Sequence, residues 1–379
     1  MSWIALRMLV GNPGKYLSMI LGVGFAALLI SQQASIFCGL MRLTASQIRD
    51  IRGADLWVMD PNIQFVDDIK PMSENDLYRV RGVAGVEWAV KLYKGLTRAR
   101  LTDGSYQQTI LIGLDDASLV GAPRQVFIGD LADLRQPDAV IVDRHGAEQL
   151  WPDDPYRLGR TFEMNDRRAV VVGYCEASKT FQTFPIIYAR YSQAIHFVPR
   201  ERKVMSFILA QSARGQDVPA LCQSIRDQTG LQAMHRDDFS VMTIWYYMRK
   251  TGIPINFGIT VLLGFIVGTA IVGQTFYLFT VENIRQFGTL KALGVGNWSL
   301  MTMVVLQAIT VGSIGYCLGV GAASWIGLMN EKASKLAFFM PWQILAITAA
   351  AILLVVVLSS LFSLRRVLTV DPATVFQGG

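Results

Sequence analysis

The chain has little charge and very few histidines and cysteines. Of its 379 residues only 17% are Asp, Glu, Lys or Arg, whereas soluble globular domains carry about 25%. Its three histidines and four cysteines are scattered and lack the paired spacing of a zinc site. The composition therefore excludes a purely soluble protein and favours no metal centre.

Motifs for phosphate binding and hydrolytic catalysis are also missing. The nearest string to a phosphate loop, residues 11–15, lacks the G-x-x-x-x-G-K-[ST] spacing. Neither H-E-x-x-H nor G-x-S-x-G occurs. We therefore expect no ATP binding, no catalytic residues and no cofactor in this chain.

The net charge of +6 does not indicate a nucleic-acid partner. The basic residues are scattered along the chain, and several flank apolar segments. A nucleic-acid-binding domain would gather them on one face or along one helix. We therefore exclude nucleic acid and interpret the basic residues as markers of membrane topology.

Long apolar runs are the dominant feature that is present. Four segments contain no Asp, Glu, Lys, Arg or His: 16–41, 253–281, 298–329 and 342–364. Because about 20 apolar residues cross a bilayer as a helix, each run predicts a transmembrane helix. We expect the second of these helices to continue to residue 287, and residues 1–15 to form an interfacial helix. The absence of ionisable residues in the runs argues against ion-driven transport.

A long polar segment, 42–252, separates the first two spans and carries most of the charge. Alternating apolar residues predict a hairpin of 86–100 with 106–113 around Asp103 and Gly104. Short apolar stretches between turn residues predict an inserted β-rich lobe over about 121–200. The predicted fold is thus a membrane α-helical protein of four transmembrane helices with a large α+β extracytoplasmic domain.

Basic residues in the short segments indicate the orientation of the chain. Six of them lie on the side of the membrane where we place the termini: Arg7, Lys15, Arg285, Lys291, Arg365 and Arg366. Only Lys332 and Lys335 lie between the third and fourth runs, on the other side. Basic residues that flank the long loop weaken the bias, but long loops cross a membrane largely regardless of charge. We expect both termini and the 365–379 tail in the cytoplasm and the 42–252 loop on the outer side of the membrane.

Small and polar residues within the runs suggest helix packing. Gly264 with Gly268, and Gly315 with Gly319, have the G-x-x-x-G spacing that lets helices approach closely, either within the chain or in a dimer. Gln307 is one of four glutamines that can hydrogen-bond between helices. In the loop, Cys175 and Cys222 are either free thiols or a disulfide, since sequence does not give their separation.

The segment between the second and third spans resembles the link of FtsX-like permeases of the MacB type. In that family the pattern is roughly R-E-[IF]-G-x-x-[KR]-A-[LV]-G-[AV]. This chain departs from it at Gln286, where an acid is common, and matches at Arg285, Phe287, Gly288, Lys291, Ala292, Leu293, Gly294 and Val295. The layout of one span, a large loop and three further spans is similar to the stand-alone DevC-type exporter permeases.

The resemblance implies protein partners that the amino-acid composition does not indicate. Family members work as a dimer of permeases on two ABC ATP-binding subunits, which would hold ATP and Mg²⁺ in place of this chain. An exporter of this kind also engages a periplasmic membrane-fusion adaptor and an outer-membrane channel. Two other functions within the family are a lipoprotein-releasing permease and an FtsX-like signalling module that activates a cell-wall hydrolase.

Residues 288–297 are the expected coupling element. We expect a bend at Gly288 and a short helix closed by Gly294 in the left-handed conformation. Three apolar residues, Phe287, Leu290 and Leu293, recur at a spacing of three. We predict that this element docks in a groove of the ATP-binding subunit; packing back on the membrane surface is the alternative.

The predicted topology can be tested by cysteine labelling. In intact spheroplasts, a membrane-impermeant thiol reagent should label Asp103→Cys in the exported loop and should not label Ser2→Cys or Gln377→Cys. Labelling at either terminus would refute the orientation, because only groups outside the inner membrane are accessible to the reagent.

Overall fold

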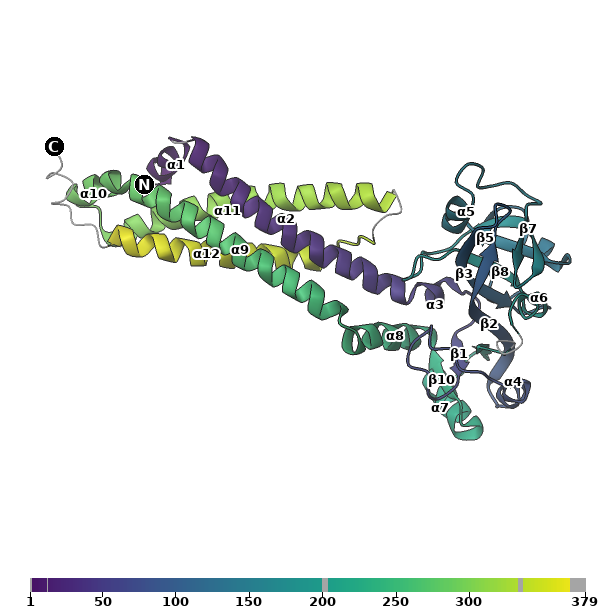
Figure 1. The fold of residues 1–379 in the computed structure, drawn as a ribbon. Coiled ribbons are helices and arrows are strands. Elements are labelled where there is room, and N and C mark those ends of the chain that lie inside the picture. The colour runs from purple at the N-terminus through teal and green to yellow at the C-terminus, as the bar shows by residue number, and fades with distance from the viewer. Residues whose placement is uncertain (1, 12, 200–203, 333–336, 369–379) are drawn as a thin grey trace. The chain divides into compact units, whose positions relative to one another are not determined.

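The computed structural model describes residues 2–11, 13–199, 204–332 and 337–368 (Figure 1). Chain contacts divide the protein into two compact units. The first, here called the helical unit, comprises residues 1–40 and 252–379, and the second, the loop domain, comprises 41–251.

Within the described residues, four helices of the helical unit are long and apolar enough to cross a membrane. They coincide with the four predicted runs: α2 (Pro13–Thr44), α9 (Ile253–Glu282), α11 (Asn297–Lys332) and α12 (Trp342–Leu368). A short helix, α1 (Ser2–Val10), precedes α2, and α10 (Ile284–Ala292) lies between α9 and α11. Most of the predicted 365–379 tail lies outside the described residues.

Helix α2 packs against glycine residues of α9 and α11. A Cβ atom added at Gly315 would lie 2.6 Å from the Cβ of Val23, and one at Gly264 would lie 3.3 Å from the Cβ of Leu29. At Gly319 an added Cβ would overlap the carbonyl oxygen of Gly24. Such contacts leave no space for a side chain, and so the backbones approach closely.

Both G-x-x-x-G motifs therefore serve packing within the chain. An added Cβ at Gly268 would overlap the Cβ of Ala26, so this motif also faces α2. Since α2 of the same chain lies against these glycines, the structure uses both motifs for packing within the chain, and a dimer contact through either motif stays a prediction.

The loop domain is built on one mixed sheet. Its strand order is β10-β1-β9-β2-β3-β8-β5-β7-β4, and β6 pairs with β2 and β7. The strands are β1 (Leu56–Met59), β2 (Val86–Arg100), β3 (Tyr106–Leu114), β4 (Gln125–Ile128), β5 (Ala139–Asp143), β6 (Thr161–Met164), β7 (Arg167–Glu176), β8 (Ile186–Arg190), β9 (Phe207–Ser212) and β10 (Gln232–His235). The predicted α+β class is confirmed.

Short helices cover and connect the strands of the loop domain. They are α3 (Ser46–Asp50), α4 (Glu74–Arg81), α5 (Arg144–Leu150), α6 (Tyr191–Ala194), α7 (Val218–Thr229), α8 (Arg236–Lys250) and a 3₁₀ turn, η1 (Leu131–Arg135). Helix α4 begins where the sequence dictates, because Ser73 and Asp76 form a reciprocal capping box. Cys175 and Cys222 are both buried free thiols.

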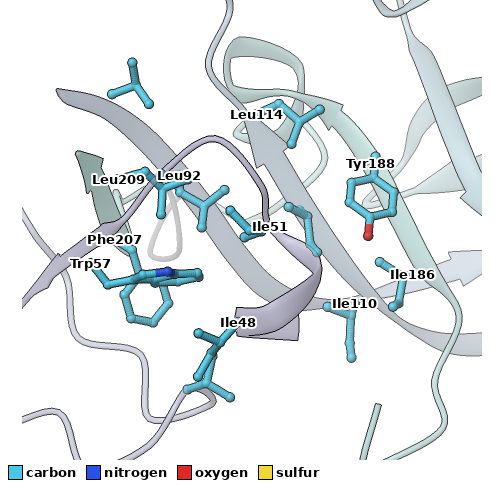
Figure 2. Packing of buried hydrophobic residues seen from close by; sticks show 14 of the residues in the cluster. Ile48, Ile51, Trp57, Leu92, Ile110, Leu114, Ile186, Tyr188, Phe207 and Leu209 are labelled. Atoms are coloured by element: carbon cyan, nitrogen blue, oxygen red, sulfur yellow. The ribbon is translucent and has the colours of Figure 1, made fainter. Parts of the chain in front are cut away.

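The strands of the predicted inserted lobe continue the same sheet. β3 and β8 pair in parallel, with Ile110 opposite Ile186 and Ile112 opposite Tyr188. One core cluster contains Trp57 and Phe207 together with Ile186 (Figure 2). Residues 121–199 are therefore not a separate body, because β3 pairs with both β2 and β8 and a shared core joins the two regions.

Close packing of α2 generates a stability prediction. Gly319→Val should lower the thermal unfolding midpoint of the purified protein in detergent, because a side chain there forces α11 away from α2; overpacking costs about 1–3 kcal/mol. Gly321 is the matched control, since an added Cβ at that position of α11 meets nothing within 4 Å. Equal midpoints for Gly319→Val and Gly321→Val would refute the packing argument.

Candidate coupling site

A break at Asn283 separates the second long helix from the predicted coupling element. Helix α9 ends at Glu282 and α10 begins at Ile284. The side-chain amide of Asn283 donates to the carbonyl oxygen of Phe279 at 2.8 Å, a local bond of the kind that competes with continuation of a helix. The predictions of a span to residue 287 and a bend at Gly288 are therefore wrong: Gly288 lies inside α10 and is buried.

The C-terminus of α10 is closed by a Schellman motif. Gly294 has φ +89°, the left-handed conformation expected from the sequence. Its N–H donates to the carbonyl of Lys291 at 3.1 Å, and the N–H of Val295 donates to the carbonyl of Leu290 at 3.0 Å. Together these bonds satisfy two carbonyls at the helix end and fix the direction of the chain towards α11.

Phe287 anchors α10 in a small hydrophobic cluster. It is 1% exposed and belongs to a cluster with Ala5 of α1 and with Leu300, Met303 and Val304 of α11. Leu290 packs partly against the same cluster. Phe287, one of the expected coupling residues, is therefore buried within this chain and not exposed for docking, and Leu290 is only partly exposed.

Helix α1 is fixed to α11 by a buried hydrogen bond. The side-chain amide of Gln307 donates to the carbonyl oxygen of Ala5 at 2.7 Å, and Gln307 is 1% exposed. The expectation that Gln307 bonds between helices is confirmed. The sequence did not indicate that the carbonyl oxygen of Ala5 is the acceptor, because every residue of a short helix carries such a carbonyl.

A cleft of about 540 Å³ lies beside α1 and the junction of α9 with α10. Trp3 and Arg7 line it from α1, and the guanidinium carbon of Arg7 lies 4.4 Å from the centre of the Trp3 ring. Glu282 and Gln286 line it from the opposite side. Glu282 also forms an ion pair with Lys15. Lys15 ends the 11–15 string, which lacks the spacing of a phosphate loop. The pair is half-exposed and contributes little stability.

Large apolar side chains are exposed at this end of the helical unit. Leu293 is 76% exposed and follows the last residue of α10, and Trp298 at the start of α11 is 77% exposed. Arg285 is exposed on α10, whereas Lys291 is half-buried. These residues stand on a backbone held by the Schellman motif and the Phe287 cluster. The arrangement offers a rigid apolar projection with basic residues beside it, which suits binding of another protein.

Comparison with sequence families decides the classification. Residues 17–228, more than half of the chain, match the family described as MacB-like periplasmic core domain. Residues 258–372 match the family described as FtsX-like permease C-terminal. The chain belongs to the MacB and FtsX type of ABC transporter permeases. The resemblance seen in the link sequence is thereby confirmed.

Curated relatives of this chain are named as permeases. One, uncharacterized, from Mycobacterium tuberculosis, is 24% identical over 340 residues, which are 89% of this chain and 88% of the relative. Another, from Mycobacterium bovis, is 29% identical over 151 residues, and this match spans 39% of the chain and only 41% of the relative. The putative hemin transport system permease protein HrtB of Staphylococcus haemolyticus is 29% identical over 126 residues, 33% of the chain and 34% of the relative.

Two solved structures are similar to part of the permease. The periplasmic region of MacB from Actinobacillus actinomycetemcomitans is 15% identical, with a TM-score of 0.38, over 51% of this chain and 94% of that structure. The extracellular domain of the ABC-type transporter YknZ from Gram-positive bacteria is 16% identical, with a TM-score of 0.35, over 48% of this chain and 98% of that structure.

Leu293 provides a sharper test of docking than the half-buried Leu290. Leu293→Asp should reduce co-purification of the ATP-binding subunit by at least tenfold, because it places an unpaired charge in an apolar contact. The thermal unfolding of the permease itself should not change, since Leu293 is exposed. Leu158→Asp is the control, as Leu158 is 49% exposed in the loop domain. Full binding by Leu293→Asp would show that this residue does not contact the subunit.

Proposed function

We propose that this permease couples ATP hydrolysis by a separate ABC ATP-binding subunit to movement of the loop domain, and that this movement expels a substrate. Two ATP-binding subunits, which hold ATP and Mg²⁺, would act on two copies of the permease. The termini and α10 would then lie in the cytoplasm and the loop domain in the periplasm. A periplasmic adaptor and an outer-membrane channel would complete the export path.

The observation that carries the proposal is that α3 and α8, the helices next to α2 and α9 along the chain, both pack in one core of the loop domain. Helix α3 follows α2 along the chain, and α8 precedes α9. Ile48 of α3 is fully buried in the core cluster that includes Trp57 of the sheet (Figure 2). Phe239 of α8 is fully buried in the same cluster. Trp57 and Phe239 have ring centres 5.4 Å apart. A displacement of either helix therefore acts directly on the packing of the sheet.

A buried carboxylate extends this connection to the far strands of the sheet. Asp50, the last residue of α3, is 3% exposed. Its carboxylate accepts hydrogen bonds from the backbone N–H and the hydroxyl of Ser178 at 2.6 and 2.8 Å. It also forms an ion pair with Arg124 at 2.8 Å. Ser178 follows β7 and Arg124 precedes β4. Charge-assisted bonds of this kind are short and directional, so α3 is tied to one end of the antiparallel β4–β7 pair, where Gln125 lies opposite Glu176.

The proposal is tested with the permease reconstituted in nanodiscs together with the ATP-binding subunit. A spin label at Asp103→Cys, on the turn between β2 and β3, should report a new distance between two permease copies when ATP is bound to a hydrolysis-deficient subunit. The same label in the Leu293→Asp permease should report the ATP-free distance.

The permease alone should hydrolyse no ATP, since it lacks a phosphate loop. Hydrolysis by the chain alone, lost on Lys15→Ala, would contradict the proposal. An unchanged label distance in a complex that binds ATP normally would also contradict it, because coupling requires the two states to differ in the loop domain.

A further inference from the structure

Helix α1 lies at the depth of the membrane surface. The buried hydrogen bond from Gln307 to the carbonyl oxygen of Ala5 joins α1 to the charge-free run 298–329 of α11. Gln307 follows the start of this run by about nine residues, which is about 14 Å along the helix. The whole run is about 48 Å long, whereas the hydrocarbon core is about 30 Å thick, so a centred span leaves about 9 Å outside the core at each end. Ala5 is therefore bonded to α11 within about 5 Å of the boundary between hydrocarbon and headgroups.

One basic side chain of α1 faces the cleft beside the junction of α9 with α10. Arg7 lines this cleft, and its guanidinium lies over the ring of Trp3. Arg7 is exposed, and among the residues that the structure describes its guanidinium forms no hydrogen bond or ion pair. Stacking on an aromatic ring leaves the N–H donors in the plane of the guanidinium available. Arg7 thus presents a fork of donors whose geometry matches two oxygens of a phosphate group.

Apolar side chains lie next to this guanidinium. Ile4 and Met8 line the cleft from α1, and Trp3 is 65% exposed. An exposed tryptophan is typical of the membrane interface, where its apolar ring contacts lipid and its N–H remains among polar groups. A soluble anion in the cleft would leave these apolar groups in contact with water. A phospholipid would cover them, because its acyl chains are attached to the same glycerol as its phosphate.

The opposite wall of the cleft is polar. Glu282 forms an ion pair with Lys15, so its carboxylate does not repel a phosphate as an isolated anion would. Asn283 and Gln286 complete this wall. The side-chain amide of Asn283 already donates to the carbonyl oxygen of Phe279, whereas Gln286 is exposed and its amide can donate to a headgroup or ester oxygen.

We propose that this cleft binds a glycerophospholipid of the adjacent leaflet, with the phosphate on Arg7, the headgroup towards Gln286 and the acyl chains beside Trp3. The bound lipid links α1 to the junction of α9 with α10. Leu293, the residue of the proposed docking contact, does not line the cleft. The test therefore requires no ATP-binding subunit, and failure of either proposal leaves the other unaffected.

The experiment measures lipid binding to the delipidated full-length permease by native mass spectrometry. The probes are dioleoylphosphatidylglycerol and dioleoylglycerol, which share their acyl chains and differ in the phosphate and headgroup. Phosphatidylglycerol should bind at least tenfold more tightly, because only it carries a phosphate for Arg7. Glycerol 3-phosphate, which has the phosphate without the chains, is then added in large excess and should not displace the bound lipid, because it cannot cover the apolar side of the cleft.

Two variants locate the binding site. Arg7→Gln should weaken binding of phosphatidylglycerol about tenfold, because it removes the charge from the hydrogen bonds to the phosphate. Trp3→Leu should also weaken it, since the guanidinium loses the ring on which it stacks. Arg249→Gln is the matched control: Arg249 is an exposed arginine that stacks on the exposed Trp245 at 4.5 Å, and it does not line this cleft. All three altered side chains are exposed, and each variant is first required to unfold at the wild-type temperature.

Several outcomes would overturn the proposal. Equal affinity for phosphatidylglycerol and dioleoylglycerol, or an equal loss of affinity in Arg249→Gln, would each do so. Wild-type affinity in both Arg7→Gln and Trp3→Leu would show that the lipid binds elsewhere. If glycerol 3-phosphate displaces the lipid and itself loses affinity in Arg7→Gln, the cleft is a site for a soluble phosphate and the phospholipid assignment is wrong.

Discussion

Close backbone contact between α2 and its neighbours is the constraint on which the helical unit depends. In a bilayer the hydrophobic effect does not draw helices together, because lipid chains are as apolar as leucine side chains. Packing at small residues must supply the attraction, and here Gly24 and Ala27 of α2 meet Gly319 of α11. Larger side chains at these points would separate the helices by more than the packing can tolerate.

The coupling end relies on that helix arrangement. Because α11 is fixed against α2, its first turns can supply Leu300, Met303 and Val304 to the cluster around Phe287. Gln307 of the same helix then holds α1. With this backbone fixed, the proposed docking at Leu293 would require no rearrangement of the loop around it, which would reduce the entropy cost of association.

In the loop domain one long strand plays the corresponding role. β2 pairs with β9 through its first half and with β3 through its second half, so a single strand joins both regions of the sheet. Its alternating faces pack in different cores: Tyr93 and Ala99 belong to one core cluster, whereas Leu92 lies in another, against which Leu96 packs. The connection from α3 and α8 reaches this sheet through the core that contains Trp57.

The sequence by itself determined the four spans, the α+β loop, the hairpin of β2 with β3 and the left-handed Gly294, because each follows from a local pattern of polarity or backbone freedom. It predicted the family through one short link segment. The tertiary structure alone decided that the glycine motifs face α2, that Phe287 is buried, and that the chain breaks at Asn283 instead of Gly288. It also decided that residues 121–200 share the main sheet. These features depend on which residues, distant in sequence, come into contact. A local pattern shows only that a face is apolar or carries small side chains, and it does not show what packs against that face.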